Sequence, residues 1–554
     1  MSQRRPGQWR FHGGLHLPEH KQESTRLPVG EMPLPRRLVL PLQQHIGEPA
    51  EPLVTPGERV LAGQMIARPQ GYVSVPIHAS SSGTVVEIGE QPVPHPSGLP
   101  APCIVIETDG KDEWKECCQP TDDYRSLDPS TLRNFIRQAG IVGLGGAGFP
   151  SFIKMNPGPD RRIELLVING AECEPYITCD DMLMRSRPME LVQGIEILMH
   201  AIQAPRCLIG IEDNKPEAIA ALRAAVAERG HEDIEVVEIP TLYPSGGERQ
   251  LIRILTGKEV PSQGLPADIG VVCHNPGTVA AIHDAIVLGR PLVERIVTVT
   301  GAGVHAPQNL RVRIGTPIAE LVERCGGYTG EVDRLLMGGP MMGFALPTDR
   351  LPVVKTTNCI LAASRAEMPP PPPPQPCIRC GKCVEVCPAQ LLPQQLHWYA
   401  HARDFDKIQD YGIFDCIECG CCAWVCPSHI PLVQYYRFAK TEIWNQERER
   451  EKAELARQRH EFRLERLERE KRERAERHRK KRKAVQKDKG DDAKKAAIQA
   501  ALERARARKA AMGVEPANTD NLTPAQRRQI EEAEARRRSV QDTTAAAPAE
   551  DKQD

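Results

Sequence analysis

The most distinctive chemistry in this 554-residue chain belongs to cysteines that occur in two copies of one spacing. The first copy is CIRCGKCVEVCP, residues 377–388, and the second is CIECGCCAWVCP, residues 416–427. Each reads C-x2-C-x2-C-x3-C-P, a run that holds [4Fe–4S] clusters. A tight loop aims three thiolates at three corners of one cube, and the fourth thiolate reaches the neighbouring cube. The duplicated run therefore predicts two [4Fe–4S] clusters close enough for electrons to pass between them.

Bacterial two-cluster ferredoxins have the same spacing, which assigns four cysteines to each cluster. The first cluster is assigned Cys377, Cys380, Cys383 and Cys426, and the second is assigned Cys387, Cys416, Cys419 and Cys422. A pair of zinc sites is the alternative, but zinc needs only four ligands per site and no Cys-Pro ending or duplicated run. Cys421 exceeds what the motif requires, so we expect it to pack. The scattered cysteines that we expect to be buried as small apolar residues are Cys173, Cys179 and Cys273.

A glycine-rich loop, GLGGAGFPSFIK at residues 143–154, is the second candidate site. Its glycines are Gly143, Gly145, Gly146 and Gly148. A Rossmann turn must follow a strand and open a helix, whereas here a predicted helix precedes the loop and Pro150 interrupts the segment after it. Without Cβ atoms, however, the backbone can approach a flat or phosphorylated ligand, and successive N–H groups can bind an anion. Lys154 lies just beyond the loop and can neutralise a phosphate.

The segments around these motifs predict a multidomain α/β and α+β protein. Short β-branched runs broken by Pro and Gly predict a β-domain over residues 38–127, which resembles the barrel-sandwich hybrid of biotinyl and lipoyl carriers but has no carrier lysine. Alternating strands and helices over residues 128–290 predict a mostly parallel sheet that carries the glycine loop. Residues 291–367 resemble a β-grasp module of the soluble-ligand-binding (SLBB) type.

The remaining segments are an N-terminal stretch, residues 1–37, and everything after a polyproline spacer at residues 368–376. The cysteine-rich domain is expected over residues 377–440 and a charged tail over residues 441–554. Within the tail, residues 447–483 hold 17 Lys and Arg against 10 Glu. Leucines and a phenylalanine there do not sustain a heptad, so we expect a long solvated helix, a second helix near residues 493–511 and disorder at residues 543–554.

Composition and the N-terminus bear on the class of protein. The formal net charge is only −1, hydrophobic residues make up 40 %, and no apolar run reaches the roughly 18 residues that a membrane span needs. The start of the chain, MSQRRPGQWRFHGG, carries charge and glycine where a secretory signal would be apolar. We therefore expect a cytoplasmic chain whose cysteines bind metal instead of forming disulfides. The basic tail is consistent with binding to anionic lipid or nucleic acid. Because Glu residues alternate with the basic ones, a solvated helix is the favoured interpretation, and no nucleic acid is expected.

The glycine loop and three later segments resemble the flavin-binding, NADH-oxidising subunit of respiratory complex I. These segments are VINGAECEP at residues 167–175, YPSGGERQLI at residues 243–252 and CHNPGTVAAI at residues 273–282. Besides the four glycines, the resemblance implies FMN and nicotinamide contacts from Lys154, Asn169, Glu172, Tyr243, Asn275 and Thr278. It also implies that Glu174 and Glu248 lie beside the nicotinamide as catalytic residues. Ala171 stands where that family carries aspartate, so one contact of the family is missing here.

Together with FHGGLHLPEHK at residues 11–21, the order of segments up to about residue 440 resembles the C subunit of the Rnf electron-transport complexes. The resemblance implies a peripheral subunit on the cytoplasmic side of the inner membrane, with bound FMN and NADH as substrate. It further implies a ferredoxin-like partner, membrane-bound partner subunits and coupling of the complex to ion translocation.

Electron counting supports this interpretation, because a nicotinamide exchanges two electrons, a cluster accepts one, and a flavin handles both. Two alternatives stay open from the sequence. A cobalamin reductase of bacterial microcompartments shares these modules, although the long tail and FHGGLHLPEHK favour the Rnf family. A relay or scaffold subunit without a nucleotide site is consistent with Ala171.

Overall fold

The computed structural model describes residues 7, 9–115, 121, 123–158, 161–487, 492–511 and 528–533 of the chain. The chain divides into two compact units, Met1–Glu447 and Arg448–Asp554. The first unit carries every predicted site residue. The disorder expected for residues 543–554 concerns residues outside the described part of the chain.

The β-rich domain near the N-terminus consists of two small antiparallel sheets with the strand orders β2-β8-β7-β4 and β3-β5-β6. Its strands are β2 (Arg37–Pro41), β3 (Glu51–Pro52), β4 (Arg59–Val60), β5 (Met65–Arg68), β6 (Ile77–His78), β7 (Gly83–Pro92) and β8 (Pro100–Thr108). The core of this domain includes four fully buried side chains of β2 and β8, which are Leu38, Leu40, Ile104 and Ile106. Alternating apolar residues in β2 thus supply the inner face that a half-buried strand needs.

A four-stranded parallel sheet with the order β11-β10-β9-β12 forms the next domain. The strands are β9 (Leu165–Gly170), β10 (Cys207–Glu212), β11 (Ile234–Ile239) and β12 (Val271–His274). The helices are α1 (Pro129–Gln138), α2 (Ser151–Lys154), α3 (Cys179–Ser186), α4 (Pro188–Ile202), α5 (Pro216–Glu228), α6 (Glu248–Thr256) and α7 (Pro276–Val287), with short 3-10 turns at Tyr124–Ser126 and Pro266–Ile269. Every residue of β10 is buried, because helices cover both faces of the sheet.

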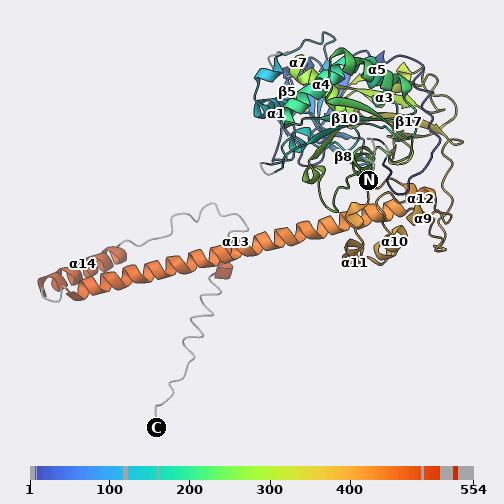
Figure 1. Cartoon of the computed structure of the whole chain (residues 1–554). Helices are drawn as coiled ribbons and strands as arrows, with labels where there is room; N and C mark the ends of the chain where they lie inside the picture. The colour runs from blue at the N-terminus through green and yellow to red at the C-terminus, as the bar shows by residue number, and fades with distance from the viewer. Residues whose placement is uncertain are drawn as a thin grey trace. The chain divides into compact units, whose positions relative to one another are not determined.

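The two faces of this sheet have separate cores. Leu166 of β9 belongs to the large cluster that includes side chains of α4 and α7, which lie together above the sheet in Figure 1. Its neighbour Val167 points the other way and packs with Leu251 of α6. The period of two along a strand therefore places α6 on the face opposite to α4 and α7.

The third domain is a six-stranded mixed sheet with the order β1-β14-β13-β17-β15-β16. It contains β1 (Gly30–Glu31), β13 (Glu294–Thr300), β14 (Gln308–Arg313), β15 (Val332–Met337), β16 (Phe344–Leu346), β17 (Cys359–Ser364) and helix α8 (Ile318–Arg324). Strand β1 comes from the N-terminal segment and pairs in parallel with β14. The start of the chain is therefore built into a domain that lies about 280 residues later in the sequence.

The cysteine-rich domain is a small helical unit that comes after an exposed polyproline stretch without helix or strand. Its helices are α9 (Lys382–Glu385), α10 (Pro393–Ala402), α11 (Phe405–Asp410) and α12 (Cys421–Trp424), with a 3-10 turn at Ile413–Asp415, and it is completed by the start of α13 (Leu432–Lys487). Leu396, Ile408, Ile413 and Tyr436 form its core. Both cysteine runs contain a one-turn helix, α9 or α12, just before the last cysteine of the run.

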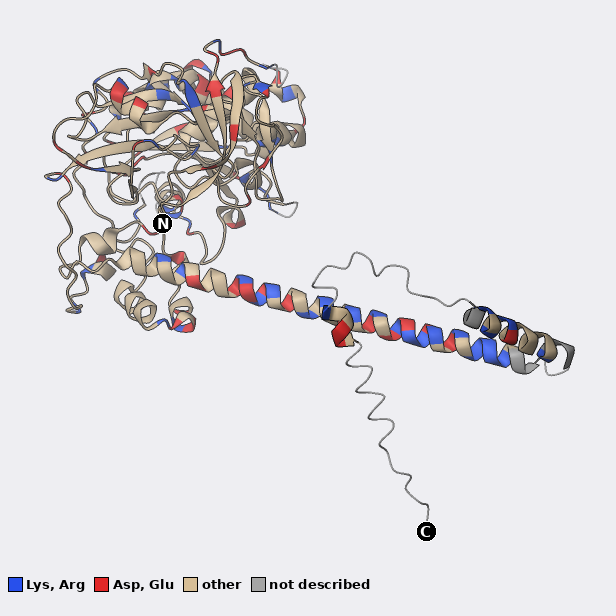
Figure 2. Ribbon diagram, turned by 180° about the vertical axis from the view of Figure 1, so that it is seen from behind, with Lys and Arg blue, Asp and Glu red and all other residues tan. Residues whose placement is uncertain are grey.

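The charged tail continues α13, and a second helix, α14 (Asp492–Ala511), comes after it. Side chains from residue 448 to residue 484 are all exposed. Acidic and basic residues alternate along the helix in Figure 2 and form pairs three or four residues apart, such as Glu454 with Arg457 and Glu473 with Arg477. Such pairs add about 0.2 to 0.5 kcal/mol each to a solvated helix. The predicted solvated helix is thus what the structure contains.

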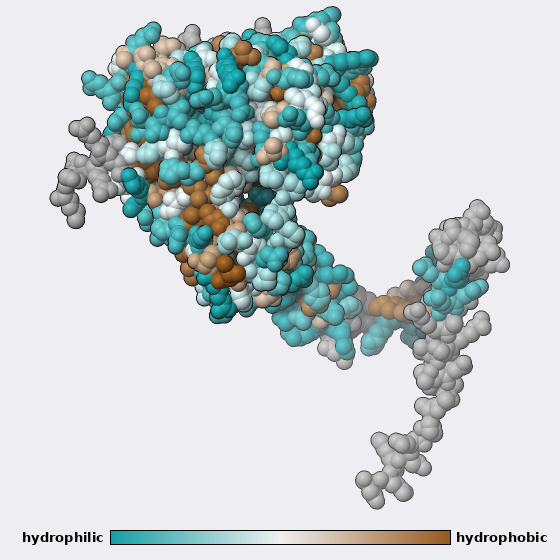
Figure 3. Space-filling model, turned by 90° about the vertical axis from the view of Figure 1, so that its right-hand side faces the viewer, coloured by the Kyte–Doolittle hydropathy of each residue, from teal (hydrophilic) through white to brown (hydrophobic). Residues whose placement is uncertain are grey.

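Figure 3 shows hydrophilic side chains over most of the visible surface, with apolar ones gathered in a few places. Several exposed apolar side chains lie in the cysteine-rich domain, among them Ile378 and Trp424. In the described part of the chain, no helix combines the length and the apolar character that crossing a bilayer requires.

A buried lysine, Lys355, joins the first three domains. Its ammonium donates hydrogen bonds to Pro76 O (3.0 Å) of the β-domain and Gly140 O (2.7 Å) of the α/β domain. Its backbone N–H donates to Gln44 Oε1 at 3.1 Å. Burial lowers the pKa of Lys355 to about 7, and the positive charge contributes to a lowered pKa at the neighbouring His78.

The lowered pKa of Lys355 leads to a prediction of how the free energy of unfolding depends on pH. Because its pKa is about 7 when folded and 10.5 when unfolded, the unfolded chain binds more protons at this site between those values. Stability should therefore rise with pH in that window, by at most about 1.4 kcal/mol per unit from this group. In Lys355→Met the rise between pH 7 and pH 9 should be smaller, as measured by denaturant unfolding at each pH. Equal pH slopes in the two proteins would contradict the prediction.

Candidate functional site

The predicted flavin residues lie on or after neighbouring strands of the parallel sheet, at the edge where the strands end. Asn169 lies near the end of β9, Glu248 comes after β11, and Asn275 comes directly after β12. In open parallel sheets this carboxyl edge is where ligands bind. Helices α6 and α7 both begin at this edge, so their N-terminal N–H groups add partial positive charge.

The glycine loop is fixed to this edge through its backbone. Leu144 N donates to the buried Thr278 Oγ1 (3.0 Å), and Leu144 O accepts from Arg295 Nη2 (3.1 Å). Gly145 and Gly146 remain exposed, and Gly146 has a φ of +113°, which side-chain-bearing residues rarely adopt. The contacts of Leu144 hold the loop while the backbone beside them stays open to a ligand.

Lys154 and Glu248 form an ion pair across the site. Burial disfavours the charged ammonium, but the carboxylate of Glu248 outweighs burial and raises the pKa of Lys154. Lys154 Nζ also donates to Cys273 O at 3.3 Å, near the end of β12. Asn169 Nδ2 donates to Gly246 O (2.8 Å), two residues before Glu248. The loop, β9, β12 and the start of α6 therefore converge on one place.

Glu172 and Asn275 mainly cap helices. Glu172 accepts hydrogen bonds from the N–H groups of Asp180 (2.7 Å) and Asp181 (3.2 Å) in the first turn of α3. Asn275 Oδ1 accepts from Gly277 N, and its Nδ2 donates to Asp180 Oδ2. Burial and the nearby Glu172 raise the pKa of Asp180 to about 7. Sequence reasoning missed Asp180 and Arg295, because neither lies in a recognisable motif.

Glu174 and Tyr243 lie where the domains meet, with their polar atoms bonded to groups outside the glycine loop. Glu174 Oε1 accepts from Met341 N (2.7 Å) and Met342 N (2.9 Å) in the turn between β15 and β16. A Cβ on Gly339 in the same turn would lie 2.2 Å from Glu174 Cγ, so only glycine fits. The Tyr243 hydroxyl donates to Cys419 O at 2.6 Å. These contacts set the two residues apart from Lys154, Asn169 and Glu248.

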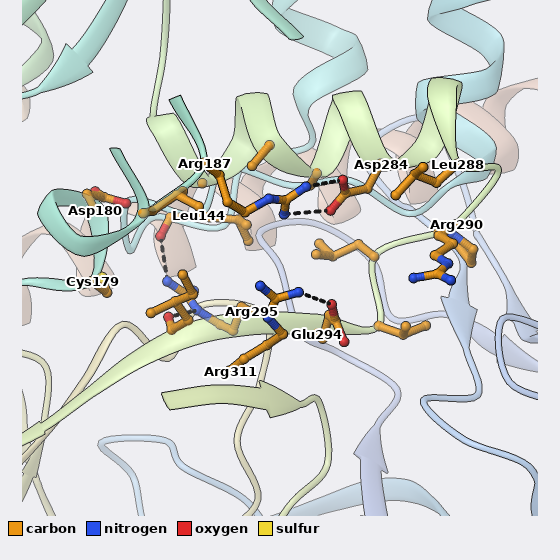
Figure 4. Close-up of a pocket in the computed structure, with 18 of the residues that line it drawn as sticks. Leu144, Cys179, Asp180, Arg187, Asp284, Leu288, Arg290, Glu294, Arg295 and Arg311 are labelled. Carbon is orange, nitrogen blue, oxygen red and sulfur yellow. Dashed lines mark hydrogen bonds and ion pairs between the residues drawn. The ribbon is translucent and has the colours of Figure 1, made fainter. Parts of the chain in front are cut away.

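A cavity of about 100 Å³ lies behind the glycine loop and is lined by Leu144, Asp180 and Arg295 (Figure 4). Two ion pairs lie in its wall, Arg187 with Asp284 through two hydrogen bonds and Arg311 with Glu294. Ligand pockets usually span about 300 to 1,000 Å³. The cavity is too small for a flavin, so the open loop in front of it is the better candidate for one.

The eight cysteines of the duplicated motif line two cavities in the cysteine-rich domain. The cavity that we name outer is lined by Cys377, Cys380, Cys383 and Cys426. The cavity that we name inner is lined by the motif cysteines Cys387, Cys416, Cys419 and Cys422 and also by Cys421. Among the eight motif cysteines, each cavity thus receives three thiols from one run and the fourth from the other, and Cys421 adds a fifth thiol to the inner cavity. Cys421 and the scattered Cys179 and Cys273 are buried, and Cys173 is half-buried.

Four protein-family models match successive parts of the chain. They are the RnfC barrel sandwich hybrid domain (residues 9–111), the Nuo51 FMN-binding domain (136–284), the SLBB domain (296–345) and the 4Fe-4S dicluster domain (376–430). The predicted fold class is therefore confirmed in each of its folded parts. The glycine loop lies within the second match, and the eight motif cysteines lie within the fourth.

Curated relatives extend this result over most of the chain. The C subunit of the ion-translocating oxidoreductase complex of Serratia proteamaculans is 48% identical over 98% of this chain and 76% of its own length. The chain belongs to this C-subunit family. The relative from Pseudomonas aeruginosa is 55% identical, and the match covers 82% of this chain but 58% of the relative. The relative from Edwardsiella ictaluri is 53% identical, and the match covers 82% of this chain and 56% of the relative. The chain thus spans little more than half the length of these two relatives.

Solved structures give only a weak likeness. An NAD+-reducing [NiFe]-hydrogenase in the H2-reduced state aligns at 17% identity with a TM-score of 0.42, over 57% of this chain and 63% of that one. At this TM-score the similarity supports no conclusion about this chain. The assignment to the C-subunit family is based on the curated relatives and the four domain matches.

The contact between Thr278 and Leu144 predicts how firmly the glycine loop holds its ligand in this member of the C-subunit family. Thr278→Val removes the acceptor of Leu144 N and leaves that N–H unpaired, which costs about 1 kcal/mol. We expect FMN to dissociate about five- to tenfold more readily, as measured by fluorescence titration of flavin-free protein. Thr278→Ser keeps the hydroxyl and should bind like the wild type. Equal weakening in both variants would assign the effect to packing instead of to the hydrogen bond.

Proposed function

We propose that this chain is a peripheral electron-transfer subunit that exchanges electrons between NADH and partner subunits through FMN and two [4Fe–4S] clusters. The partners are the membrane subunits and a ferredoxin-like subunit of an ion-translocating complex, on the cytoplasmic side of the inner membrane. The observation that carries the proposal is the crossed distribution of the eight cysteines between two cavities, in the same compact unit as the glycine loop.

The chain's own residues fit FMN at the carboxyl edge of the sheet. The exposed Gly145 and Gly146 offer backbone N–H groups, and the starts of α6 and α7 and Lys154 offer positive charge to a phosphate. Thr278 holds the loop at Leu144, while Asn169 holds Gly246 before α6 and Asn275 caps the start of α7. Bound FMN would supply the exchange between two-electron hydride chemistry and one-electron transfer.

Glu248 is the carboxylate that we place beside the nicotinamide, because it is partly exposed and is paired with Lys154, the lysine just after the loop. The contacts of Glu172 and Glu174 support a role in holding the site together instead of touching the substrate, whereas the Tyr243 hydroxyl bonds to the cysteine-rich domain at Cys419 O. No proton transfer by a side chain is needed in hydride exchange, so the contribution of these residues is orientation.

The alternatives considered from the sequence have less support. A cobalamin reductase is not favoured, because the relatives carry the name of the ion-translocating complex along most of the chain. A relay without a nucleotide site does not account for a glycine loop whose backbone is held open by Thr278 and Arg295.

The test of the proposal is anaerobic purification followed by flavin and iron analysis and addition of NADH. Bound FMN that bleaches together with the broad cluster absorbance supports the proposal. Clusters without flavin, and without reduction by NADH after FMN is supplied, would contradict it.

Replacing single cysteines extends this test to the cluster ligands. Cys380→Ser removes a thiol of the outer cavity, so we expect loss of about half of the iron and of electron transfer to acceptors, while NADH still bleaches the flavin. Cys421 also lines the inner cavity, but the motif does not use its thiol, so Cys421→Ser should keep wild-type iron. Intact iron and transfer in Cys380→Ser would overturn the ligand assignment.

A further inference from the structure

The contacts that join the cysteine-rich domain to the rest of the first unit concentrate on one of the two cysteine sets. Two of the segments that make them are far apart in sequence, the strap formed by residues 11–17 and the segment formed by residues 243–249, and Ser262 and Gln263 add hydrogen bonds to Asp415. Both segments meet the loops that carry the inner cysteines Cys387, Cys416 and Cys419.

The strap lies against the turn that delivers Cys387 to the inner cavity. His12 Nδ1 lies 3.0 Å from Cys387 O, and since a carbonyl can only accept, this nitrogen carries the proton. Gly14 N donates to Val386 O at 3.1 Å. A Cβ on Gly13 would lie 2.5 Å from the carbonyl of Val386, so the strap can approach this closely only with glycine.

The second segment meets the other two inner loops. The buried Tyr243 hydroxyl donates to Cys419 O at 2.6 Å. Arg249 Nη1 donates to Asp415 Oδ1 at 2.9 Å, and Asp415 immediately precedes Cys416. Strap and segment also pair with each other, because Leu15 N donates to Tyr243 O (2.7 Å) and Tyr243 N donates to Leu15 O (2.9 Å). They form one connected clamp.

The same short segment also faces the flavin site. Gly246 O accepts from Asn169, and Glu248 pairs with Lys154. Between residues 243 and 249 the chain therefore holds the carboxyl edge of the sheet on one side and the inner cysteine loops on the other.

The outer set has no such connection. Of the described residues between 9 and 367, none donates a side-chain hydrogen bond to the carbonyl of an outer cysteine. Cys380 is exposed, whereas three of the four inner cysteines are buried. The two sets thus differ in both solvent access and attachment.

We propose that His12, Tyr243 and Arg249 are positioning residues that clamp the inner cluster onto the flavin domain. Electrons then exchange between the flavin site and the inner cluster first, and leave through the exposed outer cluster. This inference rests on the proposed function and adds to it an order of the two clusters and a role for the FHGG segment.

The clamp also affects the inner cluster's reduction potential. A hydrogen bond donated to the carbonyl of a ligand draws electron density from the site and favours its reduced, more negative form. Losing the Tyr243 hydroxyl should therefore make the inner cluster harder to reduce and leave the outer cluster unchanged.

The experiment is an EPR-monitored redox titration of the full-length, cluster-loaded protein with Tyr243→Phe. We expect unchanged iron and flavin content and a shift of the electron distribution towards the outer cluster of about three- to tenfold, where tenfold corresponds to about 59 mV for one electron. NADH should bleach the flavin at the normal rate while the clusters are reduced more slowly. The signals are assigned with Cys380→Ser, in which the outer set is incomplete.

Two further variants keep the test decisive. Arg249→Gln breaks the pair with Asp415 but leaves the Tyr243 hydroxyl in place, and should shift the same cluster in the same direction. Tyr176→Phe is the control, because this buried hydroxyl bonds to Glu367 and not to a ligand loop. Unchanged potentials in both clamp variants, or equal shifts of both clusters, would overturn the inference. Failure of NADH to bleach the wild-type flavin would instead overturn the proposed function.

Discussion

The exchange of one cysteine between two neighbouring loops is the constraint on which the rest of the structure depends. Cys387 and Cys426 each leave their own run and line the other cavity, so neither cavity is complete unless both halves of the domain are in place. The helices between the runs serve this requirement, because Leu396, Ile408 and Ile413 form the core that fixes the distance between the halves. In the proposed function, the rest of the first unit presents the flavin site to this pair of cavities.

The parallel sheet makes that presentation possible because its strands end at one edge. Residues that are far apart in sequence, such as Asn169 and Asn275, meet there without any special sequence signal of their own. Hydrogen bonds fix the positions of buried polar groups nearby, since Glu172 caps α3 and Lys355 ties three domains to one another. Hydrogen bonds to the backbone thus help to fix this edge, together with the cores on the two faces of the sheet.

The sequence predicts well those features that have a local origin. The cysteine spacing, the glycine loop and the alternation of strands and helices each lead to the element that is observed. It predicts poorly those features that depend on contacts between domains. Glu174 and Tyr243 occur in segments that resemble a flavin site, yet their polar atoms bond to Met341 and Cys419. Asp180 and Arg295 gain their importance only through burial beside other domains, and no pattern of residues announces this.

The strap at residues 11–17 has a consequence for biosynthesis. His12 and its partner Cys387 are separated by 375 residues, so the strap leaves the ribosome long before the turn it rests on exists. At typical elongation rates the delay is on the order of tens of seconds. During this interval the strap can already pair with Tyr243, but the turn at Val386 and Cys387 does not yet exist. The strap therefore completes its contacts only after the domain that it touches has been made.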